Sequence, residues 1–251
     1  MIKTYTTSQA AKIIGVHPNT VRFYEKLGLI PKAERANNGY RIFTELHIRQ
    51  MMMLRTAFKV EILQNGLRKQ IIDIVKASAA GMYDEALLLT ENYIKNLQKE
   101  KNNANEAIDI VNKILSSDIH ESSNIKLTQK ETAQYLEITI DTLRNWELNR
   151  LFVAKRKENG YRIYTFSDLN LLKIIRTLRC ASYSLASILR MMNTIRENPN
   201  ADIRSVMDTP SPDDDIITAC DKLLSSLSAA ENNAKAINSM VIEMKKYNPP
   251  L

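Results

Sequence analysis

The sequence predicts a mainly α-helical protein that is built as a tandem repeat. Only six of its 251 residues are glycine and seven are proline, while 44% are apolar, and this composition favours helices. The hexapeptide NGYRIF at positions 38–43 returns as NGYRIY at positions 159–164. A chain of this length is long enough for two modest domains, each with its own core.

The repeat extends well upstream of the hexapeptide. Residues 6–29 align with residues 128–151, and the second copy then has one residue fewer before its hexapeptide. Within this alignment TVRFYE at positions 20–25 matches TLRNWE at positions 142–147. Because such a duplication determines the fold, each structural element is expected twice.

The positive charge of the chain belongs to the two copies. The whole chain has 35 Lys and Arg against 28 Asp and Glu, a net charge of +7. Residues 1–80 hold 13 basic and 5 acidic residues, and residues 125–208 hold 14 and 9, whereas 81–124 and 209–251 are net acidic. This distribution is typical of a protein that binds a polyanion such as DNA.

Each copy is expected to open with two short helices. Thr6-x-x-Gln9 and Thr128-x-x-Glu131 are capping boxes, in which the two side chains satisfy free amides at a helix start. A brief turn follows, and the second helix begins with Pro18 in one copy and behind the cap Thr139 in the other. Two short helices joined by a tight turn are typical of the helix-turn-helix, whose second helix enters the DNA major groove.

The apolar spacing of these helices predicts which residues reach the core. The expected core residues are Ala10, Ala11, Ile13, Ile14, Val21, Tyr24 and Leu27, and in the second copy Ala133, Tyr135, Leu136, Leu143 and Trp146. Other faces of the second helices then carry Asn19, Thr20, Arg22, Phe23 and Lys26, or Ile140, Asp141, Thr142, Arg144 and Asn145. Of these, Thr20, Arg22, Thr142, Arg144 and Asn145 are the candidate DNA contacts. The alternative for the two arginines is an ion pair with the glutamate three residues later, Glu25 or Glu147.

A β-hairpin is expected to follow each helix pair. In KAERANNGYRIF and AKRKENGYRIY the Asn-Gly pair supplies the turn, and the alternating residues after it form the return strand. A hairpin beside a helix-turn-helix is a wing, and its basic residues can bind phosphates that flank the groove. The candidate phosphate contacts are Lys32, Arg35 and Arg41 in the first wing and Lys155, Arg156, Lys157 and Arg162 in the second. Tyr40 and Tyr161 either bond to phosphate or pack beneath the wing.

These motifs resemble those of the mercury-resistance regulator (MerR) family of bacterial transcription factors. TVRFYEKLGLI with NGYRIF is close to the family's signature, and TLRNWELNRL with NGYRIY is a looser match. The cap at Thr165 and Asp168 and the segment RTLRCASYSLASI also resemble the family's next two helices. The resemblance implies winged-helix domains and a long helix that pairs antiparallel in a dimer. It further implies a dimer that bends or untwists promoter DNA, with RNA polymerase as a further partner.

The chain departs from the family pattern in several places. Arg150 replaces the glycine seen at Gly28, and Val153 replaces Pro31. The first copy has residues 60–67 in place of the YSL element of the second. No cysteine-bearing metal loop and no separate drug-binding module follow the long helices, so metal sensing is not expected, and the sequence assigns no small-molecule effector.

Two long helices with apolar stripes are expected after the two copies. The stripe residues are Leu87, Thr90, Ile94, Leu97, Lys101, Ala104, Ile108, Val111 and Leu115, and then Ile216, Cys220, Leu223, Leu227, Ala230, Ala234, Ile237, Val241 and Met244. Steps of three and four residues are typical of helices that pair. The predicted organisation is a winged-helix domain at 1–80, a long helix at 83–118, a second winged-helix domain at 125–207 and a C-terminal helix at 213–247. The two long helices would form an antiparallel coiled coil, with polar connectors at 116–124 and 208–215.

Other classes of protein are not supported by the sequence. No apolar run is long enough to span a membrane and no signal-peptide pattern is present, so a cytoplasmic, nucleoid-associated protein is expected. Cys180 and Cys220 lack partners at metal-ligand spacing, so no metal or cofactor is expected. His17, His47 and His120 lie in different segments without a nucleophile or carboxylate pattern, which argues against an enzyme.

The sequence therefore predicts a sequence-specific, double-stranded DNA-binding transcription regulator. It would act as a monomer that mimics a MerR-type dimer on an asymmetric, pseudo-palindromic promoter site. Two alternatives remain open at this point. One is an architectural DNA-binding protein in plasmid, phage or chromosome maintenance, and the other is a small-molecule or drug-binding protein.

Overall fold

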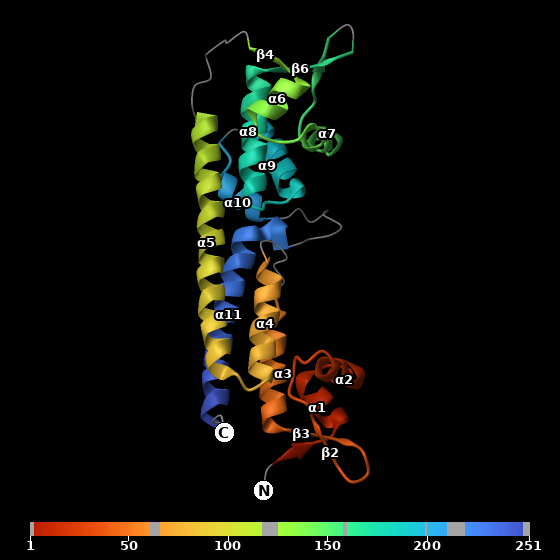
Figure 1. Cartoon of the computed structure of the whole chain (residues 1–251). Helices are drawn as coiled ribbons and strands as arrows, with labels where there is room; N and C mark the ends of the chain where they lie inside the picture. Colours follow the sequence, from red (N-terminus) through yellow and green to blue (C-terminus); the bar gives the residue numbers. More distant parts are fainter. Residues whose placement is uncertain are drawn as a thin grey trace. The chain divides into compact units, whose positions relative to one another are not determined.

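The computed structural model describes residues 3–60, 66–116, 125–157, 160–198, 200–209 and 219–247. The chain is mainly helical with two small sheets (Figure 1). It divides into two compact units, Met1–Lys99 with Ser226–Leu251, and Glu100–Ser225. Most of the two expected connectors, and residues 117–118 and 213–218 of the expected long helices, lie outside the described residues.

The first unit contains the first copy of the repeat. Its elements are β1 (Thr4–Tyr5), α1 (Thr7–Ile14), α2 (Pro18–Lys26), β2 (Glu34–Arg35), β3 (Arg41–Thr44), α3 (Glu45–Ala57), α4 (Leu67–Ala79), the first part of α5 (Tyr83–Ser116) and most of α11 (Leu223–Tyr247). The second unit contains the rest of α5, β4 (Lys126–Thr128), α6 (Gln129–Tyr135), α7 (Ile140–Leu148), β5 (Lys155–Arg156), β6 (Arg162–Thr165), α8 (Phe166–Cys180), α9 (Leu185–Glu197), α10 (Ile203–Asp208), η2 (Ala219–Lys222) and the start of α11.

The predicted helix starts are confirmed in both copies. Thr6 and Thr128 each form a complete capping box with the residue three positions later, and Thr165 forms one with Asp168 at the start of α8. The turn between the first two helices needs a left-handed backbone, which Gly15 adopts with a φ of 72°. Its counterpart Glu137 adopts a φ of 51°, a conformation that costs more for a residue with a side chain.

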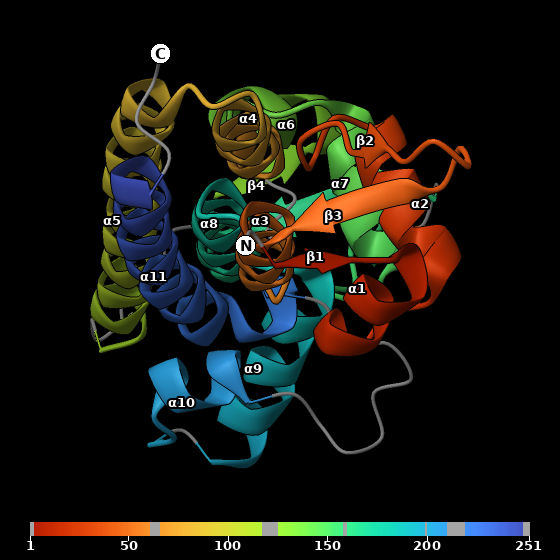
Figure 2. The same cartoon turned by 90° about the horizontal axis from the view of Figure 1, so that it is seen from below.

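Each copy forms a three-stranded antiparallel sheet, in the order β1-β3-β2 or β4-β6-β5. The predicted hairpins are present, and Gly39 and Gly160 have φ values of 80° and 79° in their turns. The third strand precedes the first helix and was not predicted from the sequence. Figure 2 shows β1 beside β3 in the first unit.

The core of the first copy is close to the one predicted. Its buried cluster is Ala10, Ala11, Ile14, Val21, Ile30, Ala33, Phe43, Ile48 and Met51. Three predicted core residues are instead exposed, Ile13 (46%), Leu27 (44%) and Tyr135 (53%). Ile13 precedes the buried Ile14 and so points to another side of a short helix. Leu27 and Tyr135 lie at helix ends, where the chain turns away from the core.

The long helices are largely as predicted, with a shift in the stripe of α5 and a later start of α11, since Ala219–Lys222 form the 3-10 helix η2 in place of the expected α-helix. Every stripe residue of α11 from Leu223 to Met244 is buried. In α5 the buried residues near the start are Ala86, Thr90, Tyr93 and Leu97, so the prediction for Leu87 and Ile94, which are only half-buried, was one position off. Leu115 is 42% exposed, so its predicted burial was wrong.

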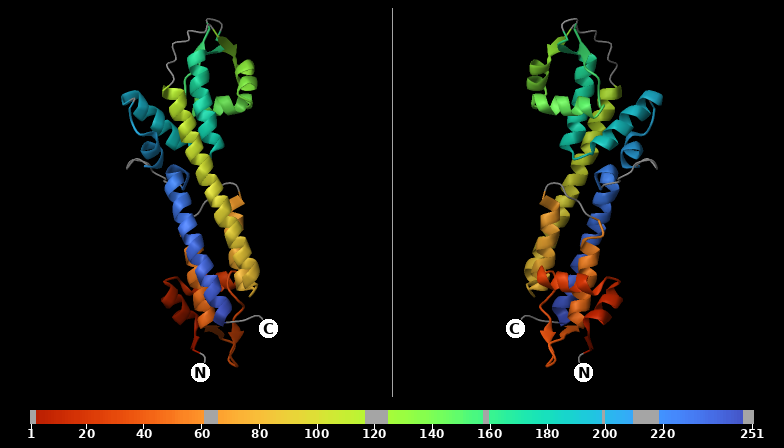
Figure 3. Two further views of the ribbon diagram at one scale, coloured as in Figure 1. Left: turned by 90° about the vertical axis from the view of Figure 1, so that its left-hand side faces the viewer. Right: turned by 90° about the vertical axis from the view of Figure 1, so that its right-hand side faces the viewer.

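Two polar contacts join α5 and α11 inside the first unit. Gln98 Nε2 donates to Glu231 Oε1 over 3.2 Å, and Lys245 pairs with Asp84. As the residue number rises along α5 it falls along α11, so the two segments run antiparallel, side by side (Figure 3).

Helix α10 has no counterpart in the first copy. In the first copy α4 leads into α5 after three residues, whereas α9 is followed by α10 and η2 before α11 begins. Arg190 of α9 donates to the backbone carbonyls of Val206, Met207 and Asp221. This arginine therefore anchors the extra segment on the second copy. Among the described helices, none combines the length and apolarity that a membrane span needs.

Candidate nucleic-acid interface

The outer faces of α2 and α7 carry a matched pair of arginines. Arg22 Nη1 donates to Asn19 Oδ1 over 3.1 Å, and Arg144 Nη1 donates to Asp141 Oδ1 over 3.1 Å. All four side chains are exposed. The proposed ion pairs of Arg22 and Arg144 with Glu25 and Glu147 are therefore not the contacts that these arginines make.

Glu25 and Glu147 instead bind the arginine of the hairpin. Arg41 Nε lies 2.5 Å from Glu25 Oε2, and Arg162 Nε lies 2.8 Å from Glu147 Oε2. The glutamate side chains are only 12% and 19% exposed. Glu25 also accepts the backbone N–H of Ala33 over 3.1 Å. These two helix–hairpin ion pairs fix each hairpin against the second helix of its copy.

The helix–hairpin ion pairs change what is expected of Arg41 and Arg162. Both were predicted to bind phosphate, and a carboxylate partner neutralises much of the charge that a phosphate would meet. A charge-assisted hydrogen bond of this kind orders both side chains. The geometry favours a positioning role for these two arginines, and a direct phosphate contact stays a prediction.

The other basic residues of the hairpins divide into two groups. Arg35 donates to the carbonyl of Gly39 over 3.0 Å and Arg156 to that of Gly160 over 3.4 Å, so both brace the turn from which they project. Lys32, Lys155 and Lys157 are exposed cations. Lysines at such exposed positions can bind phosphates.

The tyrosines and the other candidates of the second helices also have defined places. Tyr40 and Tyr161 are 74% and 72% exposed, so the alternative that they pack beneath the wing is wrong. Thr20 is half-buried, and the Thr142 hydroxyl bonds the cap Thr139 over 2.8 Å. Asn145 is exposed on the same side of α7 as Asp141 and Thr142, and its Oδ1 accepts a hydrogen bond of 3.3 Å from Asn149 Nδ2.

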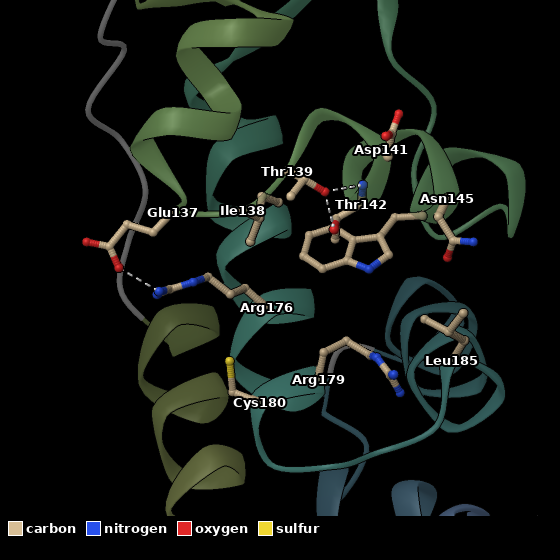
Figure 4. Close-up of a pocket in the computed structure, with 11 residues that line it drawn as sticks. Glu137, Ile138, Thr139, Asp141, Thr142, Asn145, Arg176, Arg179, Cys180 and Leu185 are labelled. Carbon is tan, nitrogen blue, oxygen red and sulfur yellow. Dashed lines mark hydrogen bonds and ion pairs between the residues drawn. The ribbon is translucent and has the colours of Figure 1, made fainter.

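A groove lies beside α7 that the sequence did not indicate. Its volume is about 570 Å³, and Figure 4 shows it between α7 and the end of α8. Arg176 on its far side donates to Glu137 over 2.9 Å. In the first copy the matched Arg55 donates to the carbonyl of Gly15 over 3.4 Å. The available signal was the match of Arg55-Thr56 with Arg176-Thr177 in the repeat. Each of these arginines holds the turn between the first two helices.

The two copies differ at the start of the helix that follows the hairpin, where the first copy has His47. It replaces Asp168 of the capping box at the start of α8, and its Nδ1 accepts the N–H of Thr44 over 3.0 Å. Burial lowers the pKa of His47, because the charged ring would lose its solvation. Within the described residues, no group of three or more potential ligands could hold a metal ion.

The exposed lysines allow a direct test of phosphate binding. Lys157→Ala should lower the slope of log K against log salt by about 0.9, because one fewer counterion is released from the DNA. Lys95→Ala removes the same charge from the exposed face of α5 and should leave the slope nearly unchanged. Binding titrations over a range of salt concentrations give both slopes. Equal slopes for Lys157→Ala and the parent would remove this lysine from the DNA contact.

Comparison with known proteins places the two copies in one family. The model of the MerR family regulatory proteins matches residues 6–43, and the model of the MerR HTH family regulatory proteins matches residues 127–195. The first matched segment covers α1, α2 and their hairpin, and the second covers α6, α7, their hairpin, α8 and most of α9.

Individual relatives agree with these matches. The chain is 27% identical over 99 residues to a mercuric resistance operon regulatory protein of Bacillus cereus, covering 39% of this chain and 75% of the relative. It is 34% identical over 98 residues to an HTH-type transcriptional regulator of Haemophilus influenzae, covering 38% and 69%. It is 42% identical over 53 residues to the HTH-type transcriptional regulator CueR of Escherichia coli, covering 21% of this chain and only 39% of that relative. No solved structure matches the chain.

The chain belongs to the MerR family of regulatory proteins, and it carries two MerR-like segments.

Proposed function

We propose that this chain is a sequence-specific, double-stranded DNA-binding transcription regulator that mimics a MerR-type dimer within one polypeptide. The observation that carries the proposal is the duplicated helix pair with its hairpin, held in each copy by a helix–hairpin ion pair. In this proposal α1 and α2, and α6 and α7, are helix-turn-helix motifs. The hairpins are their wings, and α2 and α7 enter the major groove.

The contacts of the long helices support the dimer-like organisation. In the first unit Arg49 of the first copy lies 3.3 Å from Glu243 and 4.8 Å from the ring of Tyr247, both in α11. In the second unit Tyr183 donates to the carbonyl of Ala104, and Arg204 lies 4.0 Å from Asp109, both in α5. Each copy thus contacts the long helix that follows the other copy. Contacts of that kind occur twice in a two-fold symmetric dimer.

The organisation of the proposed regulator follows from these contacts. Residues 1–80 and 125–207 are the two DNA-binding domains, and α5 and α11 are the helices that pair as an antiparallel coiled coil. Because α2 and α7 differ in sequence, the DNA target has two unlike half-sites. The target lies in a promoter, where RNA polymerase is the protein partner. Such a protein is found at the nucleoid.

The pairing of α5 with α11 predicts a monomer. It occupies the surface through which two separate chains would otherwise associate. Light scattering at micromolar concentration should therefore give a mass near 28.7 kDa, that of one chain. A stable mass of twice that value would contradict the single-chain organisation.

Selection of bound fragments from random DNA, followed by footprinting, tests the function itself. The expected result is one operator with two unlike half-sites, and a change of transcription from that operator with bacterial RNA polymerase. Weak preference with many copies bound to each fragment would instead indicate an architectural protein. Tight binding of a small molecule that is independent of DNA would indicate a ligand-binding protein.

A further inference from the structure

Asn19 and Asp141 occupy the same place in the two second helices and differ in chemistry. Asn19 is the second residue of α2 after its cap His17, and Asp141 is the second residue of α7 after its cap Thr139. Both side chains are exposed. Asp141 is one of the residues that line the groove beside α7, and in Figure 4 its carboxylate is turned away from Arg176 and Arg179. The first turn of a second helix is the part that contacts base edges.

The two residues have the same local geometry. Each accepts a hydrogen bond of 3.1 Å from the arginine three residues later, Arg22 or Arg144. The arginine is therefore the same in both copies. Its N–H donors match the acceptors of guanine, so guanine is the expected base contact of the arginine in both half-sites. What changes between the copies is the partner of the arginine, an amide in one and a carboxylate in the other.

We propose, on the basis of the function proposed above, that Asn19 and Asp141 distinguish the two half-sites. Asn19 forms hydrogen bonds to an adenine in the first half-site, and Asp141 accepts a hydrogen bond from a cytosine in the second. An asparagine amide has a donor and an acceptor, which match N7 and N6 of adenine in the major groove. A carboxylate only accepts hydrogen bonds. Cytosine offers it the N4 donor, whereas guanine and thymine present only acceptors there. Adenine places the acceptor N7 beside its donor, which repels the second carboxylate oxygen.

The charge distribution predicts that the second copy discriminates between bases more strongly than the first copy does. Helix α2 has two basic residues, Arg22 and Lys26, against Glu25, whereas α7 has only Arg144 against Asp141 and Glu147. The hairpin of the second copy compensates, with Lys-Arg-Lys at 155–157 where the first has Glu-Arg-Ala at 34–36. In the second copy phosphate attraction therefore comes mainly from the hairpin. A base without a donor would remove water from the Asp141 carboxylate and give it no hydrogen bond beyond that from Arg144, which is costly.

A purely structural role for Asp141 makes a different prediction. An acidic residue in the first turn stabilises a helix through its macrodipole. Asp141→Asn would then lower the melting temperature of the protein slightly and leave the base preference where it was. Base preference and melting temperature together therefore separate the two roles.

Reciprocal substitutions in the full chain test the proposal. The probes are duplexes based on the operator that the parent selects, with all four base pairs placed in turn at each half-site position. Asp141→Asn should move one position of the second half-site from cytosine to adenine, by about tenfold in relative affinity. Asn19→Asp should move the matched position of the first half-site from adenine to cytosine. The double variant should bind best to the operator with these two bases exchanged.

Glu91→Gln is the control, because it makes the same change of charge on the exposed face of α5 and should alter no base preference. If Asp141→Asn folds and binds with every base preference unmoved, the proposal is overturned and Asp141 is a helix-stabilising residue. Selection of guanine or thymine at the position that Asp141→Asn alters would also overturn it. If the parent selects no sequence at all, the proposed function fails as well, which is a distinct result.

Discussion

Val241→Asp should lower the affinity for the full operator at least tenfold while most of the helix content remains. Val241 is fully buried in α11, so the new carboxylate would be unpaired in an apolar environment, which costs several kcal/mol. We expect α11 to separate from α5 or to change its register. The two DNA-binding domains have their own cores and should stay folded. Each domain would then bind DNA weakly and independently. The gain in affinity from effective concentration, which reaches about 10²–10⁴-fold for linked sites, would be lost.

Ile242→Asp is the matched control for this prediction. Ile242 is the next residue of α11 and is 39% exposed, so a carboxylate there stays hydrated. It should bind the operator like the parent. Circular dichroism and a binding titration on both variants are sufficient. Operator affinity equal to that of the parent in a folded Val241→Asp protein would mean that the two domains are not coupled through these helices.

Glu25→Gln should weaken specific binding about tenfold, although it removes a negative charge from a DNA-binding domain. The carboxylate holds Arg41 at 2.5 Å and the N–H of Ala33 at 3.1 Å. An amide replaces the ion pair by a weaker neutral bond, which loosens the hairpin against α2. The lost affinity reflects a misplaced wing, and the salt slope should not decrease, since no phosphate contact is removed.

Glu34→Gln makes the same change of charge in the same domain, on an exposed residue of β2. Simple electrostatics predicts that it should bind DNA somewhat more tightly than the parent. Opposite signs for the two variants would establish the positioning role of Glu25. If Glu25→Gln also bound more tightly, Arg41 would be released to contact phosphate, as the sequence alone suggested.

Much of the local structure could be predicted because its signals are local. The capping boxes at Thr6 and Thr128 and the Asn-Gly hairpin turns depend on residues within a few positions of one another. The third strand escaped prediction because two or three residues carry no usable alternation, and its pairing partner lies about 40 positions away, as Thr4 pairs with Thr44.

The site was harder to predict for the same physical reason. The sequence offered an ion pair of Arg22 with Glu25 as the alternative to a DNA contact, since residues three positions apart are neighbours on a helix. The structure gives Glu25 to Arg41, sixteen positions away. Folding of the hairpin onto α2 creates that ion pair, and the spacing of residues along one helix cannot predict it. Glu147 and Arg162 repeat the same arrangement, so comparison of the two copies was the one sequence signal available.

The exchange of long helices between the two copies has a consequence for how the proposed regulator responds to its own abundance. Two identical separate chains must meet before they bind, so at low expression their operator occupancy falls with the square of the chain number. Here both halves come from one translation event, and occupancy falls only in proportion to it. A cell that holds a few molecules would still carry a complete regulator in each of them.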